Sequence, residues 1–327
     1  MDRTSINKAC RYNVLMEPIL STLPQRRTKW RLSAGLIGAV LLLGIALPCL
    51  LSLPWSLKQY DAQDYTLINT APGSTFWLGS DGLGRSLGWR CLLGGAISLG
   101  IGICAAIISV GIGVTWGTIA GYAGGRVDAL MMRIVDVLFG LPYILLVVLL
   151  DLALSPFVEH VAKWVMPDTW AVQLSQLLTL LIAIGGVSWL TLARVIRGQV
   201  LSLREQPFIE AARACGVGPV RTFWYHLLPN LVGPIVVYAT LTIPNAILQE
   251  SFLSFLGIGV QAPMPSWGNL ASEGTEQLAS IGLTGSFTRW WLLVWPCVLL
   301  GLTLMGLNFV GDALRDKLDP RSRKSHR

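Results

Sequence analysis

Charged residues are scarce in this 327-residue chain: they make up 13% of it, whereas globular proteins average about a quarter. Hydrophobic residues make up 53%, and the mean hydropathy is +0.59. A soluble domain needs far more charge than this to cover its surface. The composition therefore excludes an ordinary soluble protein and predicts a protein that crosses a membrane several times.

Metal-ligating residues are scarce too. The three histidines, His160, His226 and His326, lie outside every predicted span, and the six cysteines form no CxxC or Cys/His pair. An intramembrane hydrolase or metalloprotease would therefore lack its usual groups. We predict no metal site and no cofactor.

A phosphate-binding GxxxxGK[ST] loop is also missing. Without that loop the chain is not expected to bind a nucleotide by itself. Any process driven by ATP would have to take its energy from another chain.

Six apolar runs are long enough to cross a bilayer as helices, so the predicted fold is all-α and polytopic. The first run is too long and too far from the N-terminus for a cleaved signal peptide. Among the prolines inside the runs are Pro142 in the third, and Pro234 and Pro244 as interruptions of the fifth. The predicted spans are Ala34–Leu53, Cys91–Tyr122, Ile134–Leu154, Val172–Leu192, Leu231–Leu256 and Trp290–Phe309.

Glycines recur at every fourth position of the second run, at Gly113, Gly117 and Gly121. This spacing places three small residues on one helix face and lets another helix approach closely. General enrichment of glycine in membrane helices is the alternative explanation. We predict a packing face.

The positions of the positive charges predict the orientation. With six spans both termini lie on one side, and that side holds 20 Lys and Arg residues while the opposite loops hold 5. Positively charged loops stay in the cytoplasm. Both termini are therefore predicted to be cytoplasmic, and the net charge of +7 reflects topology and requires no nucleic acid.

Residues 204–230 form a polar segment between the fourth and fifth runs. Pro207 fits the first turn of a helix, where its missing N–H costs nothing, and Glu210 suits the positive N-terminal end. Gly216 can end the helix in a left-handed turn. Four apolar residues at i, i+3, i+4 and i+7 are expected to share one face: Phe208, Ala211, Ala212 and Cys215. Such a helix can lie on lipid headgroups or dock against a partner.

The letters of this segment resemble the EAA loop of bacterial ABC importer permeases, with Glu210-Ala211-Ala212 followed by Gly216 and Leu228-Pro229. Other blocks match in order and narrow the resemblance to the C-type subunit of dipeptide and oligopeptide importers. Ser86, where the family has aspartate, and Pro207 depart from the pattern. The further blocks are Leu78–Asp81 with Gly84-Arg85, Gly121–Pro142, Trp189–Leu201 and Glu250–Gly268.

The resemblance implies a type I ABC importer permease fold, a transport subunit that is not itself an enzyme, in a bacterial plasma (inner) membrane. In this family the loop helix docks on an ATPase, so the implied coupling residues are Phe208, Glu210, Ala211, Ala212, Cys215 and Gly216. The implied partners are a homologous permease in a heterodimer, two ATP-binding-cassette subunits and an external substrate-binding protein. The implied solutes are di- and oligopeptides, with nickel chelates or oligosaccharides as alternatives.

Ionisable residues inside a membrane are functional candidates, although pairing at the interface explains them equally well. Asp136 and Glu250 are the predicted pathway or partner-contact residues; Asp151 and Asp312 also lie near span ends. A passive membrane scaffold remains the least favoured alternative.

The predicted organisation combines these elements. It is a cytoplasmic segment (1–33), a first span (34–53), an extracytoplasmic loop (54–90), a five-helix permease core (91–313) and a basic cytoplasmic tail (314–327).

Overall fold

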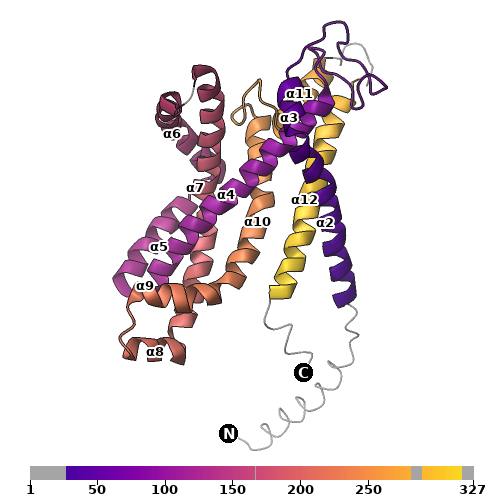
Figure 1. Cartoon of the computed structure of the whole chain (residues 1–327). Coiled ribbons are helices and arrows are strands. Elements are labelled where there is room, and N and C mark those ends of the chain that lie inside the picture. The colour runs from indigo at the N-terminus through magenta and orange to yellow at the C-terminus, as the bar shows by residue number, and fades with distance from the viewer. Residues whose placement is uncertain (1–26, 166, 281–288, 319–327) are drawn as a thin grey trace, which may run out of the picture.

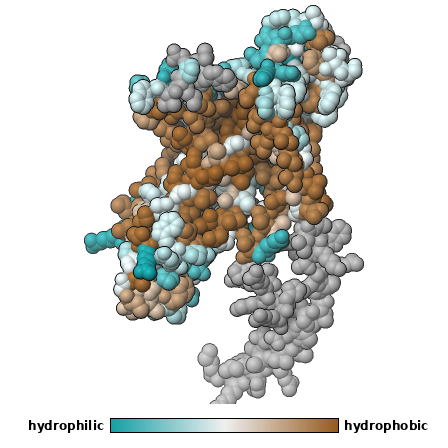
Figure 2. Space-filling model, viewed as in Figure 1, coloured by the Kyte–Doolittle hydropathy of each residue, from teal (hydrophilic) through white to brown (hydrophobic). Residues whose placement is uncertain are grey.

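The computed structural model describes residues 27–165, 167–280 and 289–318. Over these ranges the regular secondary structure is helical, connected by turns and loops, and there is no strand. Six helical stretches are long and apolar enough to cross a membrane. Figure 2 shows a broad hydrophobic band between two more polar ends. The predicted all-helical fold with six spans is confirmed; residues 1–26 and 319–327 of the predicted terminal segments lie outside the described residues.

The helices divide the molecule into two ends. Figure 1 places α3 and α11 at one end, called here the cap end, and α8 and α9 at the other, called the loop end. The start of α2 and the finish of α12 point to the loop end. The elements are α2 (Arg27–Leu51), α3 (Leu53–Gln59), α4 (Leu87–Ala123), α5 (Gly125–Phe139), α6 (Tyr143–Val165), α7 (Asp168–Arg204), α8 (Pro207–Ala214), α9 (Pro219–Thr222), the π-helix η1 (Phe223–Leu227), α10 (Leu228–Phe255), α11 (Trp267–Ser280) and α12 (Trp291–Leu318).

The packing of α4 on α7 forms the centre of the bundle. Each helix has 37 residues, about 55 Å of helix, and α4 crosses the bundle diagonally from the cap end to the loop end (Figure 1). A Cβ atom on Gly117 would lie only 2.5 Å from the Ala193 carbonyl oxygen of α7, and one on Gly121 would lie 2.9 Å from that of Arg197. The predicted glycine packing face is therefore confirmed.

The third predicted span is divided in the structure. Helix α5 ends at Phe139, and the membrane-crossing helix α6 begins at Tyr143. The break falls at Pro142 because proline disfavours a helical conformation in the residue before it. The predicted start at Ile134 is therefore wrong. By contrast, Pro234 and Pro244 lie inside a continuous α10, so the predicted interruption of the fifth span is wrong too; neighbouring helices let membrane helices tolerate internal prolines.

The helices also extend beyond the predicted apolar runs. Helix α12 continues to Leu318 with Arg315 and Lys317 in its last turn, where positive charge suits the helix dipole. Helix α11 lies between the fifth and sixth spans, outside every predicted apolar run. Hydropathy detects only the part of a helix that lies inside the bilayer. Polar helical turns outside the bilayer are therefore not predicted from it.

Candidate functional site

The loop between α7 and α10 is a helix, a turn and a wide helical return. Helix α8 begins at Pro207 and has Glu210 in its first turn. It ends in a Schellman cap in which the Gly216 N–H donates to the Arg213 carbonyl at 2.9 Å and the Val217 N–H donates to the Ala212 carbonyl at 3.0 Å. Gly216 has φ = +77°, a conformation that favours glycine. The predicted helix stop at Gly216 is confirmed.

The two faces of α8 have different surroundings. Ile209 is completely buried in the core cluster of α7, η1 and α10, and Ala212 is 8% exposed. Phe208, Ala211 and Cys215 are exposed. The predicted four-residue stripe is therefore split, because Ala212 faces the chain's own helices while the other three face outward. Ile209 was not among the predicted site residues, because the spacing placed the small residues on a single face.

Three side-chain contacts hold the loop against the ends of α4 and η1. The Arg213 guanidinium lies 4.9 Å from the centre of the Tyr122 ring, and Arg204 Nη1 donates to the Gly121 carbonyl at 3.3 Å. The Phe208 and His226 rings are 6.4 Å apart. Since Gly121 and Tyr122 lie in the last turn of α4, these contacts connect α8 and the end of α7 to the end of α4.

Two ion pairs connect α5 to α7 near the loop end. Arg197 donates to both carboxylate oxygens of Asp128, at 2.5 and 2.6 Å. Asp136, a predicted site residue, accepts from Arg194 at 2.8 Å, and its side chain is 65% exposed. Arg194 also lies 4.0 Å from the centre of the Phe139 ring. Asp136 thus lies on an open face, paired within its own chain.

A cavity of about 510 Å³ lies beside this charged face, between the α5–α6 break, α7 and α10. The Tyr143 hydroxyl donates to Gln249 across it and lies 3.4 Å from the Ser188 hydroxyl. These residues were not among the predicted site residues, although the helical spacing of the polar residues on α10 indicates a shared polar face. The lining comprises Leu138, Phe139, Leu141, Tyr143, Leu146, Val187, Ser188, Leu190, Thr191, Leu192, Tyr238, Leu241, Thr242, Asn245 and Gln249.

Glu250 has a different location from its neighbour Gln249. It is 0% exposed and does not line the cavity. The hydroxyls of Ser98 and Ser254 each donate to its carboxyl group at 2.8 Å, and that of Ser251 does so at 3.3 Å. In this structure Glu250 therefore joins α10 to α4 inside the chain.

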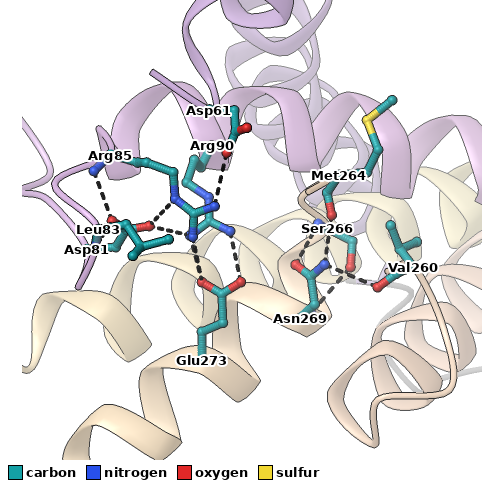
Figure 3. Close-up of polar contacts among 10 residues, drawn as sticks. All are labelled: Asp61, Asp81, Leu83, Arg85, Arg90, Val260, Met264, Ser266, Asn269 and Glu273. Carbon is teal, nitrogen blue, oxygen red and sulfur yellow. Dashed lines mark hydrogen bonds and ion pairs between the residues drawn. The ribbon is translucent and has the colours of Figure 1, made fainter. Parts of the chain in front are cut away.

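At the cap end, five charged side chains form a network (Figure 3). Arg90, 1% exposed, donates to Asp81 at 2.7 Å and to both oxygens of Glu273, at 2.6 and 2.8 Å. Asp81 also accepts from Arg85 Nε at 2.7 Å, and Arg85 reaches Asp61 at 3.2 Å. The network joins residues 61–85, the start of α4 and α11. It forms with Ser86 in place of the family's aspartate.

Hydrogen bonds also order the segment between α10 and α11. The Asn269 amide donates to the Val260 and Met264 carbonyls and accepts from the Ser266 N–H (Figure 3). The buried Trp267 donates to the Cys91 carbonyl of α4 at 3.1 Å. In the 61–85 segment, the Thr66 hydroxyl and N–H donate to Asp64 and lower the pKa of that exposed carboxyl. Hydrogen bonds therefore connect the segment between α10 and α11 with α11, and α11 with α4, at the cap end.

A six-span bundle with a cavity lined partly by polar side chains and an anchored, outward-facing loop helix is the arrangement of a membrane-spanning transport subunit. The sequence comparison makes this specific: a family model described as "Binding-protein-dependent transport system inner membrane component" matches residues 113–324. The chain belongs to this family.

Among its relatives is the oligopeptide transport system permease protein OppC of Haemophilus influenzae, 40% identical over 291 residues, covering 88% of this chain and 85% of that protein. The dipeptide transport system permease protein DppC of Bacillus subtilis is 40% identical over 262 residues, or 80% and 74% of the two chains. The Escherichia coli OppC is 39% identical over 292 residues, or 89% and 88%.

A solved structure shares the fold. It is described as inward facing conformations of the MetNI methionine ABC transporter, and the match has a TM-score of 0.50 at 18% identity, covering 71% of this chain and 98% of that chain. The ABC importer permease fold predicted from the sequence is thereby confirmed.

Proposed function

We propose that this chain is the permease subunit of an ATP-driven importer of di- and oligopeptides and that α8 couples it to an ATPase. The relatives named above are oligopeptide and dipeptide permeases. The observation that carries the coupling role is the two-sided α8, buried at Ile209 and exposed at Phe208, Ala211 and Cys215. A helix that packs on its own chain with one face and exposes the other face to a partner can transmit a displacement of that partner.

The proposed assembly has four further components: a homologous permease, two ATPase subunits and a binding protein on the opposite side. The exposed loop helix is the ATPase contact in this assembly, and the cap is the end nearest the binding protein. Loop charge favours cytoplasmic termini. A cysteine introduced at Thr70 is expected to react with a thiol reagent from outside the cell, and a cysteine at residue 320 only after permeabilisation. The reverse pattern contradicts this orientation.

Uptake of radiolabelled peptides by the reconstituted assembly tests the transport role. Glu210→Lys reverses a charge on the exposed side of α8, and Gly216→Pro cannot adopt the left-handed cap conformation. Both changes are expected to lower ATP-coupled uptake and ATPase association by at least about tenfold, because a lost contact of roughly 1.4 kcal/mol already changes binding that much, while membrane insertion persists.

Gly198→Ala provides the control, since Gly198 has open space around it and lies on α7 outside the loop. Normal uptake by both loop variants contradicts the coupling role. Uptake of a nickel chelate or an oligosaccharide, with no peptide uptake, reassigns the solute and leaves the coupling role standing.

A further inference from the structure

One side of α10 carries a polar stripe formed by Tyr238, Thr242, Asn245 and Gln249. Their spacing of four, three and four residues keeps them on one helix face, over roughly 16 Å of helix. All four line the cavity beside α7. Polar residues within a membrane face the protein interior or a water-filled passage in preference to lipid. The side of α10 that carries the stripe is therefore expected to face away from lipid.

Hydrogen bonding within the chain satisfies some of these groups and leaves others open, the Asn245 amide among them. The Thr242 hydroxyl donates to the Tyr238 carbonyl at 2.8 Å, and Ser188 on α7 donates to the Ile184 carbonyl at 2.8 Å. Asn245 is exposed, and no hydrogen bond joins its side chain to any residue that the structure describes. An amide at this depth needs a partner from outside the chain, since lipid provides none.

The cavity lining contains no charged side chain. Arg194, which lies over the ring of the lining residue Phe139, pairs with Asp136 at 2.8 Å. Asparagine and glutamine side chains offer both donors and acceptors, which matches neutral amides and does not favour ions of either sign. Leucine and tyrosine side chains supply the apolar remainder of the wall.

We infer that this polar stripe is the surface through which the chain contacts its solute and that Asn245 hydrogen-bonds the main-chain amides of a peptide. The inference rests on the proposed function for the class of solute. Every peptide residue except proline presents one N–H and one C=O. The polar stripe therefore binds the main chain of the peptide, whatever the charge of its side chains. A cavity of about 510 Å³ lies within the range of small-ligand sites, roughly 300–1,000 Å³.

The first test measures uptake of trialanine by the assembled transporter carrying Asn245→Leu. Uptake is expected to fall about fivefold to tenfold, as the loss of one hydrogen bond predicts. A matched pair provides the control: Thr242→Val changes the stripe, whereas Thr240→Val makes the same substitution outside the cavity, where its hydroxyl bonds the Val237 carbonyl. We expect a decrease for Thr242→Val and none for Thr240→Val.

Peptides of different charge test the main-chain reading. Asn245→Leu is expected to lower the uptake of Ala-Ala-Ala, Ala-Glu-Ala and Ala-Lys-Ala by the same factor. A loss confined to one of the three peptides overturns the main-chain reading, and equal uptake by Asn245→Leu and Thr240→Val overturns the contact itself. Co-purification with the partner subunits separates either outcome from a folding failure, and Asn245→Gln is expected to recover part of the uptake.

Thiol accessibility distinguishes this inference from the proposed function. Asn245→Cys and Thr240→Cys are introduced after Cys10 and the exposed Cys104, Cys215 and Cys297 are replaced by Ser, and the complex is treated with a charged methanethiosulfonate. Reaction at position 245 and none at 240 supports a water-lined passage whichever solute is carried. Equal reaction, or none at either position, overturns it. Absence of peptide uptake by the wild-type complex counts against the proposed function alone.

Discussion

The two ends of α4 are held in different ways. At the cap end, Arg90 is 1% exposed and lies among carboxylates from two other segments. At the loop end, Gly117 and Gly121 bring α4 against α7 backbone to backbone, and the charge pairs lie outside this contact. The Asp136 side chain is 65% exposed and that of its partner Arg194 is 36% exposed.

This difference determines how each end responds to a disturbance. Buried charges must keep their partners, because an uncompensated charge in a dry environment costs several kcal/mol. A glycine contact has no such requirement, so helices joined by it can shift while remaining apolar on both sides. The cap end is therefore suited to a fixed role, and the loop end to the movement that the proposed coupling helix α8 would transmit.

Arg90→Gln is expected to cause the largest loss of stability in this comparison. The substitution leaves Glu273 without its bidentate partner, while Asp81 keeps Arg85. We expect the free energy of unfolding to fall by about 3 kcal/mol, the lower end of the range for a broken buried pair. Denaturant titration in detergent micelles, followed by tryptophan fluorescence, measures the change.

Glu159→Gln is the control for Arg90→Gln, because it removes a carboxylate from the exposed pair with Lys163. Its effect should stay below about 1 kcal/mol. Similar losses in the two variants contradict the distinction between the buried network and exposed pairs.

Gly117→Ala is expected to have the second-largest effect. The new methyl group would lie 2.5 Å from the Ala193 carbonyl oxygen, so α4 and α7 must separate. Overpacking of this kind costs about 1 to 3 kcal/mol. Gly111→Ala offers a matched control on the same helix, since nothing lies within 4 Å of its added Cβ. Equal stability of the two variants in the same denaturant titration contradicts the close-packing role.

The sequence predicts those features that depend on local pattern. The six spans follow from hydropathy, the α4–α7 contact from glycines at Gly113, Gly117 and Gly121, and the end of α8 from Gly216. In each case one short stretch contains the whole signal, because helix period and glycine conformation act over a few residues.

Features formed by distant segments are not predictable in this way. Arg90 and Glu273 are 183 positions apart, and no sequence pattern around either residue predicts the other as its partner. The buried side of α8 depends on where α7 and η1 pass behind it, so Ile209 was missed and Ala212 was assigned to the outer face. Hydropathy also overlooked α11, since a short amphipathic helix outside the bilayer has no long apolar run.

Asp136→Asn is expected to have the smallest effect on stability and to show how the loop end differs from the cap end. Exposed pairs contribute about 1 kcal/mol or less, and salt screens them at a Debye length of about 3 Å in 1 M salt. The loss relative to wild type should therefore be small at low salt and disappear at 1 M salt. Asp128→Asn should cost more at low salt, because its pair with Arg197 is bidentate and the Asp128 side chain is 12% exposed. The Arg90→Gln deficit should depend less on salt, since Arg90 and Asp81 are buried and salt screens buried pairs much less than exposed ones. If all three deficits shrink together as salt is raised, the cap network is open to solvent and the two ends of α4 are held by interactions of the same kind.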